Sequence, residues 1–342
     1  MKAKIKPRID LENRTKLESV IPLSTPFIVF VDPSDACNFQ CKFCPTGDRK
    51  LMKEIGRPLK IMDFDLFKKI IDDICEFEKP IKVLRLYKDG EPLLNSNFAE
   101  MIKYAREKGC VEKIDTTTNA SLLNPKINTE IMSAGLDRVN ISIEGINAQQ
   151  YWDFSSYKVD FDKLVANIKD LYEKRGNCEI IVKINGDILT EEDKELFYKI
   201  FGDIADGVYI EHVMSCWPEF ELKEVQVNQE FGIYGQKPTE VSVCPYPFYS
   251  LSINSDGLAS LCFLDWSRKL IVGDAKKESV KDIWLGEKIN QYRKMFLKKE
   301  RKNNPICKDC GQLTHGMPDN IDNFAEELLK KMEEKCQSGK MS

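Results

Sequence analysis

The chain has 342 residues and lacks the features that would tie it to a membrane, to secretion or to nucleic acid. No apolar run approaches the length that crosses a bilayer, and the basic N-terminus lacks the apolar stretch of a secretory signal. The net charge is only −4, so it gives no reason to expect a nucleic-acid or membrane-surface partner. We therefore expect a cytoplasmic protein with neither kind of partner.

Histidine is scarce as well, and the chain has only His212 and His315. Cysteine, by contrast, is plentiful. The twelve cysteines are too many for a typical reduced enzyme and too few for a disulfide scaffold of this length. In a reducing compartment, clustered cysteines indicate metal ligands rather than disulfides. Five cysteines stand apart from any cluster: Cys75, Cys110, Cys178, Cys216 and Cys336.

A first cysteine set, Cys37, Cys41 and Cys44, forms a CxxxCxxC loop. Three thiolates on one short loop can converge on a single metal centre. They are one short of the four that a saturated zinc or iron–sulfur site takes, and an open position is what a catalytic centre needs. A zinc knuckle or an ordinary surface loop is the alternative.

A second set lies towards the C-terminus. Cys244 and Cys262 bracket an expected hairpin with strands at 248–253 and 258–263, and Cys307 and Cys310 form a CxxC knuckle. Four cysteines can saturate one centre, either an iron–sulfur cluster or a structural zinc ion.

Between the two sets, strand patterns alternate with amphipathic helix patterns. The first expected strand, residues 27–32, ends just before the first cysteine loop. Six such units are fewer than the eight of a closed barrel, so we expect an α/β fold with a partial (β/α)6 TIM-like barrel. Its chemistry should lie beyond the C-terminal strand ends. The other expected strands are 81–87, 113–118, 138–143, 179–184 and 207–212, and the helices are one capped by Asp63, then 96–108, 126–134, 161–174 and 191–201.

The periodicity lapses after the sixth strand, and this defines the expected domains. A small cysteine-rich C-terminal domain should follow the barrel, with helical stretches at 278–285 and 287–299. The divisions are an N-terminal extension (1–24), the barrel (25–212), a linker across the barrel mouth (213–240), the cysteine-rich domain (241–318), and a C-terminal helix with its tail (319–342).

Placed after a first strand, the CxxxCxxC loop resembles that of the radical S-adenosylmethionine (SAM) enzymes. The resemblance implies that Cys37, Cys41 and Cys44 hold three irons of a [4Fe–4S] cluster and that SAM chelates the fourth iron. It places Phe43 near the adenine of SAM. The turn at Asp89, Gly90, Glu91 and Pro92 is similar to the family's GGEP motif, with Asp89 where the first glycine usually stands. That motif binds the SAM ammonium group.

The ends of later strands carry further residues that the resemblance assigns to SAM or to the cavity. Asn119 stands where the family often has a TNG sequence, and Ser142 and Glu144 share one face of the fourth strand. Lys183 lies in an otherwise apolar strand, so we expect it to have a partner or a ligand.

The second set, Cys244, Cys262, Cys307 and Cys310, is similar to the SPASM-type extension of radical SAM enzymes. That likeness implies one auxiliary [4Fe–4S] cluster with no open iron, which suits an electron relay. Cys216 is a candidate donor of a hydrogen atom or proton to a substrate radical, and His212 a candidate base or substrate contact. An ordinary loop cysteine and a satisfied strand-end histidine are the alternatives.

We therefore expect a radical SAM enzyme, an oxidoreductase or epimerase, that forms a 5′-deoxyadenosyl radical. It would abstract hydrogen from a sugar, an aminocyclitol or a nucleotide-sugar-like small molecule, and a flavodoxin- or ferredoxin-type protein would supply electrons. The segment before Cys37 is too short for an N-terminal peptide-binding domain, which favours a small substrate. Peptide or protein modification through thioether formation or residue oxidation is the first alternative, and a non-enzymatic, zinc-stabilised binding module is the second.

Overall fold

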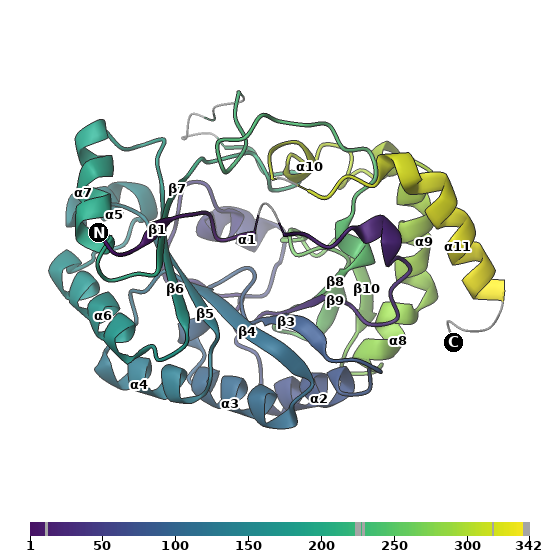
Figure 1. Ribbon diagram of the computed structural model, residues 1–342, viewed down its shortest axis with the longest axis horizontal. Coiled ribbons are helices and arrows are strands. Elements are labelled where there is room, and N and C mark those ends of the chain that lie inside the picture. The colour runs from purple at the N-terminus through teal and green to yellow at the C-terminus, as the bar shows by residue number, and fades with distance from the viewer. Residues whose placement is uncertain (11–12, 223–226, 228–229, 317, 338–342) are drawn as a thin grey trace.

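A computed structural model describes residues 1–10, 13–222, 227, 230–316 and 318–337 (Figure 1). The other positions belong to the expected extension, linker, cysteine-rich domain and tail, and lie outside the described residues. Among the described residues, no helix is both long and apolar enough to span a bilayer.

Ten strands form one sheet in the order β1-β7-β6-β5-β4-β3-β2-β8-β9-β10. Pairing is parallel from β1 to β8 and antiparallel in the last two pairs. The six expected barrel strands are present, so the partial-barrel prediction is confirmed. The strands are β1 Lys4–Ile5, β2 Ile28–Val31, β3 Ile81–Arg85, β4 Val111–Thr118, β5 Arg138–Ile143, β6 Glu179–Asn185, β7 Gly207–Glu211, β8 Ser250–Ile253, β9 Leu258–Ser260 and β10 Ile271–Asp274.

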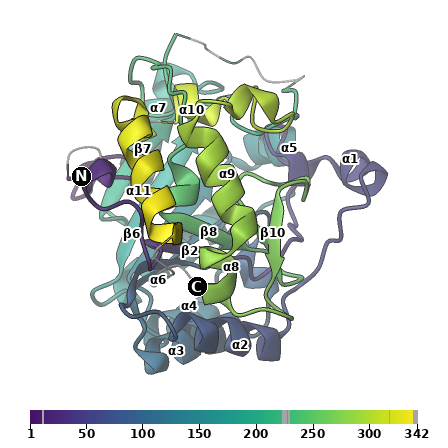
Figure 2. The same cartoon turned by 90° about the vertical axis from the view of Figure 1, so that its right-hand side faces the viewer.

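Helices α2, α3, α4 and α6 follow the outer side of strands β3 to β6 (Figure 1), and α9 and α11 lie side by side near the C-terminus (Figure 2). The helices are α1 Arg49–Glu54, α2 Phe64–Ile74, α3 Phe98–Lys108, α4 Pro125–Ser133, α5 Ala148–Ser155, α6 Phe161–Lys174, α7 Glu191–Phe201, α8 Val280–Leu285, α9 Glu287–Leu297, α10 Gln312–His315 and α11 Ala325–Gln337.

Local sequence explains the expected helices. The Asp63 carboxylate accepts hydrogen bonds from the backbone N–H groups of Asp65 and Leu66, which caps α2 as predicted. Gly109 ends α3 with a left-handed φ of 70°, which glycine adopts at little cost. The apolar faces of both helices are buried against the sheet.

Several elements were not predicted. Helices α1 and α5 are six and eight residues long, too short for a clear apolar period. Strand β1 has two residues, and only its pairing with β7 defines it. The predicted hairpin is present as β8 and β9, but β8 also pairs in parallel with β2, which extends the barrel sheet into the cysteine-rich part of the chain.

The N-terminal segment crosses from one edge of the barrel to the other (Figure 1). It begins as β1 beside β7, and its Leu23 carbonyl accepts a hydrogen bond of 3.1 Å from Trp284 Nε1 in α8. Arg8, Ile9 and Leu17 in this segment line a cavity together with residues of strands β3 to β6.

Two of the five cysteines that stand apart from the sequence clusters are paired with each other in the structure. Cys75 and Cys110 form a disulfide, with their Cα atoms 5.1 Å apart. Cys75 follows α2 and Cys110 precedes β4, so the sheet brings both to one end of the barrel, which sequence spacing does not reveal. The side chain of Cys336 lies outside the described ones.

Candidate active site

The first cysteine loop leaves the C-terminal end of β2, as predicted. Burial raises the pKa of the Cys37 thiol to about 12, with the Glu91 carboxylate adding to the effect. It also raises the pKa values of Cys41 and Cys44, and Cys37 and Cys44 act on Cys41 in the same direction. Three neighbouring thiols that resist ionisation need a positively charged centre to be held as thiolates. The donor set therefore suits an iron–sulfur cluster.

The unpredicted helix α5 helps to hold this loop. The backbone N–H groups of Gln40 and Lys42 donate to the carbonyls of Ser155 and Phe154, at 2.8 and 3.2 Å. Gly47 follows the loop, where a Cβ atom would lie 2.5 Å from the carbonyl oxygen of Cys41, so no larger residue fits. The loop shape therefore depends on backbone contacts from a distant segment.

The turn at 89–92, which is predicted to bind the SAM ammonium group and is called the SAM-ammonium turn below, packs directly on the first cysteine loop. The Glu91 backbone N–H donates to the Ala36 carbonyl at 2.8 Å. The Glu91 carboxylate accepts from Thr118 Oγ1 at 2.7 Å and from the Asn119 backbone at 2.8 Å. Burial raises its pKa to about 6. The Asn119 amide lies 3.9 Å from Cys37 Sγ, so Glu91 and Asn119 meet beside the first cysteine.

Beside the loop lies a cavity of about 620 Å³. It gathers residues from separate strands and from the stretch after β7. Burial raises the pKa of the Glu144 carboxyl to about 7, Glu211 adds to the rise, and Lys183 opposes it. Six predicted site residues line the cavity: Phe43, Ser142, Glu144, Lys183, His212 and Cys216.

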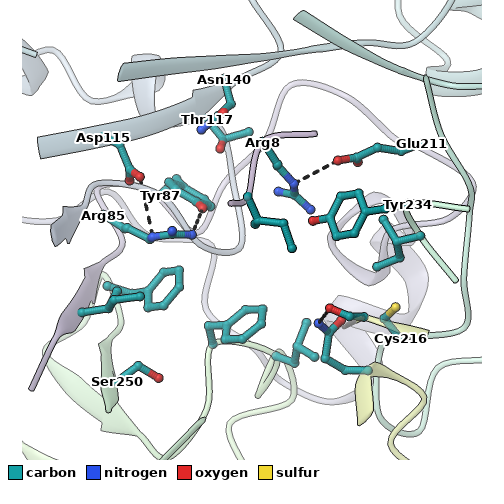
Figure 3. A pocket seen from close by; sticks show the side chains of 18 of the residues that line it. Arg8, Arg85, Tyr87, Asp115, Thr117, Asn140, Glu211, Cys216, Tyr234 and Ser250 are labelled. Carbon is teal, nitrogen blue, oxygen red and sulfur yellow. Dashed lines mark hydrogen bonds and ion pairs between the residues drawn. The ribbon is translucent and has the colours of Figure 1, made fainter. Parts of the chain in front are cut away.

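The cavity has a polar wall, most of which was not predicted from the sequence (Figure 3). It is built by side chains on the inner face of β4 and β5 and at the end of β3. The alternation of polar residues in 81–87 and 113–118 was a usable signal for this face. On it lie Arg85, Tyr87, Asp115 and Asn140, which were not predicted, and Thr117, which belongs to the polar strand end that was expected to line the cavity.

Arg8 reaches the same cavity from the N-terminal segment, and no sequence signal marked it (Figure 3). Its Nε lies 3.0 Å from Glu211 Oε1, and Glu211 Oε2 lies 2.9 Å from Lys183 Nζ. Burial opposes ionisation of Glu211, but the two cations outweigh it and lower the carboxyl's pKa. Lys183 thus has the partner that its strand position implied.

His212 and Cys216 line the cavity from the stretch after β7. His212 Nδ1 lies 2.7 Å from Asp187 Oδ1, which fixes the ring. Burial, with a contribution from Cys310, raises the pKa of the Cys216 thiol to about 12. Cys216 is therefore a protonated thiol between the cavity and the second cysteine set.

The second cysteine set comes together from three segments. Cys244, Cys262, Cys307 and Cys310 all line one small cavity. Burial raises the pKa of Cys307 to about 12, and the neighbouring Cys310 adds to it. As with the first loop, these thiols suit a metal centre that stabilises their thiolate forms.

Family models match both parts of the chain. The radical SAM superfamily model matches residues 31–203, about half of the chain, and a SPASM model, described as an iron–sulfur cluster-binding domain, matches residues 244–311. The chain belongs to the radical SAM superfamily and carries a SPASM-type C-terminal domain. Its cofactors are SAM, the [4Fe–4S] cluster that binds SAM, and an auxiliary iron–sulfur cluster. These matches do not support the zinc-module alternative.

Relatives differ in what they act on. An AdoMet-dependent heme synthase of Methanosarcina barkeri is 24% identical over 311 residues, which span 80% of this chain and 85% of that protein. BtrN in complex with AdoMet and 2-DOIA has a TM-score of 0.55 at 18% identity, over 86% of this chain and 97% of BtrN. Streptococcus suis SuiB bound to precursor peptide SuiA has a TM-score of 0.62 at 15% identity, over 88% of this chain and 73% of SuiB. At these identities the two structures establish the fold alone.

Proposed function

We propose that this enzyme abstracts hydrogen from a small polar molecule held in the cavity, either a sugar, an aminocyclitol or a nucleotide-sugar-like compound. The outcome is dehydrogenation or epimerisation. One observation carries the choice of substrate: several buried polar atoms of the cavity wall have no hydrogen-bond partner among the described residues.

These atoms include both acceptors and donors. Asp115 Oδ1 and Asn140 Oδ1 accept, Asn185 Nδ2 donates, and Thr117 Oγ1 can do either. A buried polar group without a partner costs free energy, so turning these side chains toward a bound molecule with hydroxyl or amino groups would stabilise this wall. Such a molecule presents donors and acceptors around one ring.

An aromatic patch adjoins the polar wall, where the Phe30 ring contacts Arg85 and Tyr87, and it suits the apolar face of such a ring. Phe30 and Phe263 are stacked with centroids 5.1 Å apart, and Tyr246 and Tyr249 lie beside them. A substrate that reaches both the aromatic patch and the polar wall would pack an apolar face on the rings and form hydrogen bonds with the polar side chains.

The proposed roles of the chain's residues follow from their places. Cys37, Cys41 and Cys44 hold the SAM-binding cluster, and Cys244, Cys262, Cys307 and Cys310 hold the auxiliary cluster. When bound, cluster and SAM supply the 5′-deoxyadenosyl radical. The protein binds and orients SAM and the substrate, and it excludes water from the cavity. The residues proposed to contact SAM are Phe43, Gly90, Glu91, Asn119, Ser142, Glu144 and Lys183.

Cys216 decides between the two outcomes. The Cys216 thiol can donate a hydrogen atom to a substrate radical, which gives epimerisation. The thiyl radical left on Cys216 returns to the thiol by taking up one electron from the flavodoxin-type reductant and one proton. If it does not, a cluster held by Cys244, Cys262, Cys307 and Cys310 would accept the radical's electron while the substrate loses a proton, which gives dehydrogenation. Replacing Cys216 by Ala should therefore suppress an epimerisation and leave a dehydrogenation largely intact.

The test is an anaerobic assay of the holoenzyme with SAM and a flavodoxin-type reductant. A panel of aminocyclitols, nucleotide sugars and short peptides is screened for stimulation of 5′-deoxyadenosine release. Products are analysed by mass in normal and deuterated water: a loss of two hydrogens marks dehydrogenation, and one solvent-derived deuterium marks epimerisation. Stimulation by peptides alone would overturn the proposal, as would zinc without iron and sulfide in protein purified anaerobically.

A further inference from the structure

A buried ionic cluster connects the auxiliary-cluster domain (residues 244–311) to the SAM-ammonium turn. We call Asp32, Asp35, Lys88, Asp89 and Arg268 the Arg268 cluster. Arg268 Nη2 lies 2.5 Å from Asp35 Oδ1 and 3.7 Å from Asp89 Oδ2, and Lys88 Nζ lies 2.6 Å from Asp89 Oδ2. Arg268 is the one member that comes from the C-terminal domain.

The cluster is enclosed by protein. The side chains of Lys88, Asp89 and Asp35 are fully buried, and that of Arg268 is 9% exposed. The carboxylates of Asp32, Asp35 and Asp89 approach within 4.8 Å, but Lys88 and Arg268 already supply the positive charge that a metal ion would bring. Removing one partner from a buried ion pair leaves an uncompensated charge, so such a network holds its members tightly in place.

Arg268 itself is held in an unusual conformation. Its φ of 59° is left-handed, which costs a non-glycine residue free energy. Arg268 Nη1 also lies 3.2 Å from Asp256 Oδ1 in the turn between β8 and β9. The guanidinium group thus joins that turn to the two core aspartates.

The far side of the cluster is the SAM-ammonium turn. The Asp89 backbone N–H donates to Asp32 Oδ2 at 3.0 Å. At Gly90, a Cβ atom would lie 2.2 Å from the carbonyl oxygens of Ser34 and Ala36, so the turn lies flat on the segment that leads to Cys37. The Asp89 side chain enters the Arg268 cluster, which explains why aspartate can stand where the family usually has glycine.

We propose that Arg268 is a positioning residue that fixes the SAM-ammonium turn through Asp35 and Asp89, so that SAM binding depends on the auxiliary-cluster domain. This inference rests on the proposed role of Gly90 and Glu91 in binding SAM. It adds a second role for the C-terminal domain, independent of electron transfer and of the substrate.

The test measures SAM affinity of the anaerobic holoenzyme by equilibrium dialysis, with iron content and the EPR spectrum of the reduced SAM-binding cluster recorded in parallel. Arg268→Gln should weaken SAM binding about tenfold, as expected for a partner that orients a binding group. It should also reduce the spectral change that SAM causes, while iron content stays at the wild-type level. Lys269→Gln is the matched control, because Lys269 makes an exposed pair with Glu219 at 2.8 Å.

Two further variants keep the test decisive if Arg268→Gln folds poorly. Arg268→Lys retains the charge but not the fork of the guanidinium, so it should weaken SAM binding less than Arg268→Gln. Asp89→Asn should weaken SAM binding as well, and combining it with Arg268→Lys should cost less than the product of the two separate effects.

Wild-type SAM affinity in Arg268→Lys and Asp89→Asn, or simple multiplication of their effects, would overturn the inference. Glu91→Gln separates this failure from failure of the proposed function. If Glu91→Gln weakens SAM binding and the Arg268 variants do not, only the positioning role is wrong. If Glu91→Gln has no effect either, the turn is not the SAM site.

Discussion

The two cysteine sets differ in how the chain builds them. Cys37, Cys41 and Cys44 lie on one loop, so their convergence needs only local backbone geometry. Cys244, Cys262, Cys307 and Cys310 come from three segments that the sheet and the C-terminal helices bring together. A ligand set from one loop leaves one side open, whereas a set drawn from several segments can surround its centre.

Their positions agree with this difference. The loop of the first set carries Phe43 into the large cavity, while the second set lines a small cavity of its own. Cys216 lies between them. We infer that the open site does the chemistry and that the closed site exchanges electrons with it. Four substitutions test this division, and the most damaging one comes first.

Cys41→Ala should abolish 5′-deoxyadenosine formation, because two thiolates cannot hold the SAM-binding cluster. Product release under reducing conditions, measured together with iron content, checks this. Cys178→Ala is the control, since Cys178 is buried and belongs to neither set. Retained SAM cleavage in the Cys41 variant would show that the open site lies elsewhere.

Cys262→Ala should abolish substrate conversion but spare slow SAM cleavage, because only the closed site loses a ligand. The same assay with a stimulating compound from the panel, followed by product analysis, gives both rates. If this variant loses SAM cleavage as completely as Cys41→Ala, while retaining the iron of the first cluster, the two sites are not functionally separate.

Arg8→Gln should impair substrate turnover in the cavity and leave both clusters intact. Losing a charge-assisted contact of about 1.5–3 kcal/mol predicts a fall in kcat/KM of roughly ten- to a hundredfold for the stimulating compound. SAM cleavage without substrate should not change. Lys4→Gln, on the exposed strand β1, is the control. An equal loss in both reactions would place Arg8 at the SAM site instead.

Asp187→Asn should have the smallest effect, because it weakens a partly exposed hydrogen bond to His212. A loss of about 0.5–1.5 kcal/mol predicts a two- to tenfold lower kcat with the stimulating compound. Asp162→Asn, at an exposed position of α6, should leave kcat unchanged. An unchanged kcat in Asp187→Asn would remove His212 from the list of candidate catalytic residues.

Much of the barrel could be read from the sequence because its helices carry their own caps and apolar faces. The helices at 161–174 and 191–201 are found within the expected bounds. Elements without a period of their own, such as α5 and β1, could not be found this way. They form because neighbouring segments supply their partners.

The candidate site likewise contains residues that local sequence indicates and residues that only long-range contacts place there. Local spacing indicated the cysteine loop, and the resemblance to radical SAM enzymes assigned the Gly90–Glu91 turn and the strand-end residues Ser142, Glu144 and Lys183 to SAM. Neither could identify Arg8 or Arg268, because Arg8 meets Glu211, and Arg268 meets Asp35, across more than two hundred residues of chain. Hydrophobic periodicity in the sequence does not indicate ion pairs between such distant residues.

By itself, the sequence determined the kind of chemistry, because three cysteines on a short loop leave a metal centre with an open position. Only the tertiary structure decided what surrounds that centre. Strand register sets which polar side chains face the cavity, and packing between distant segments brings Arg8 to the cavity and Arg268 to Asp89. Both depend on contacts between distant segments, which exist only once the sheet has formed.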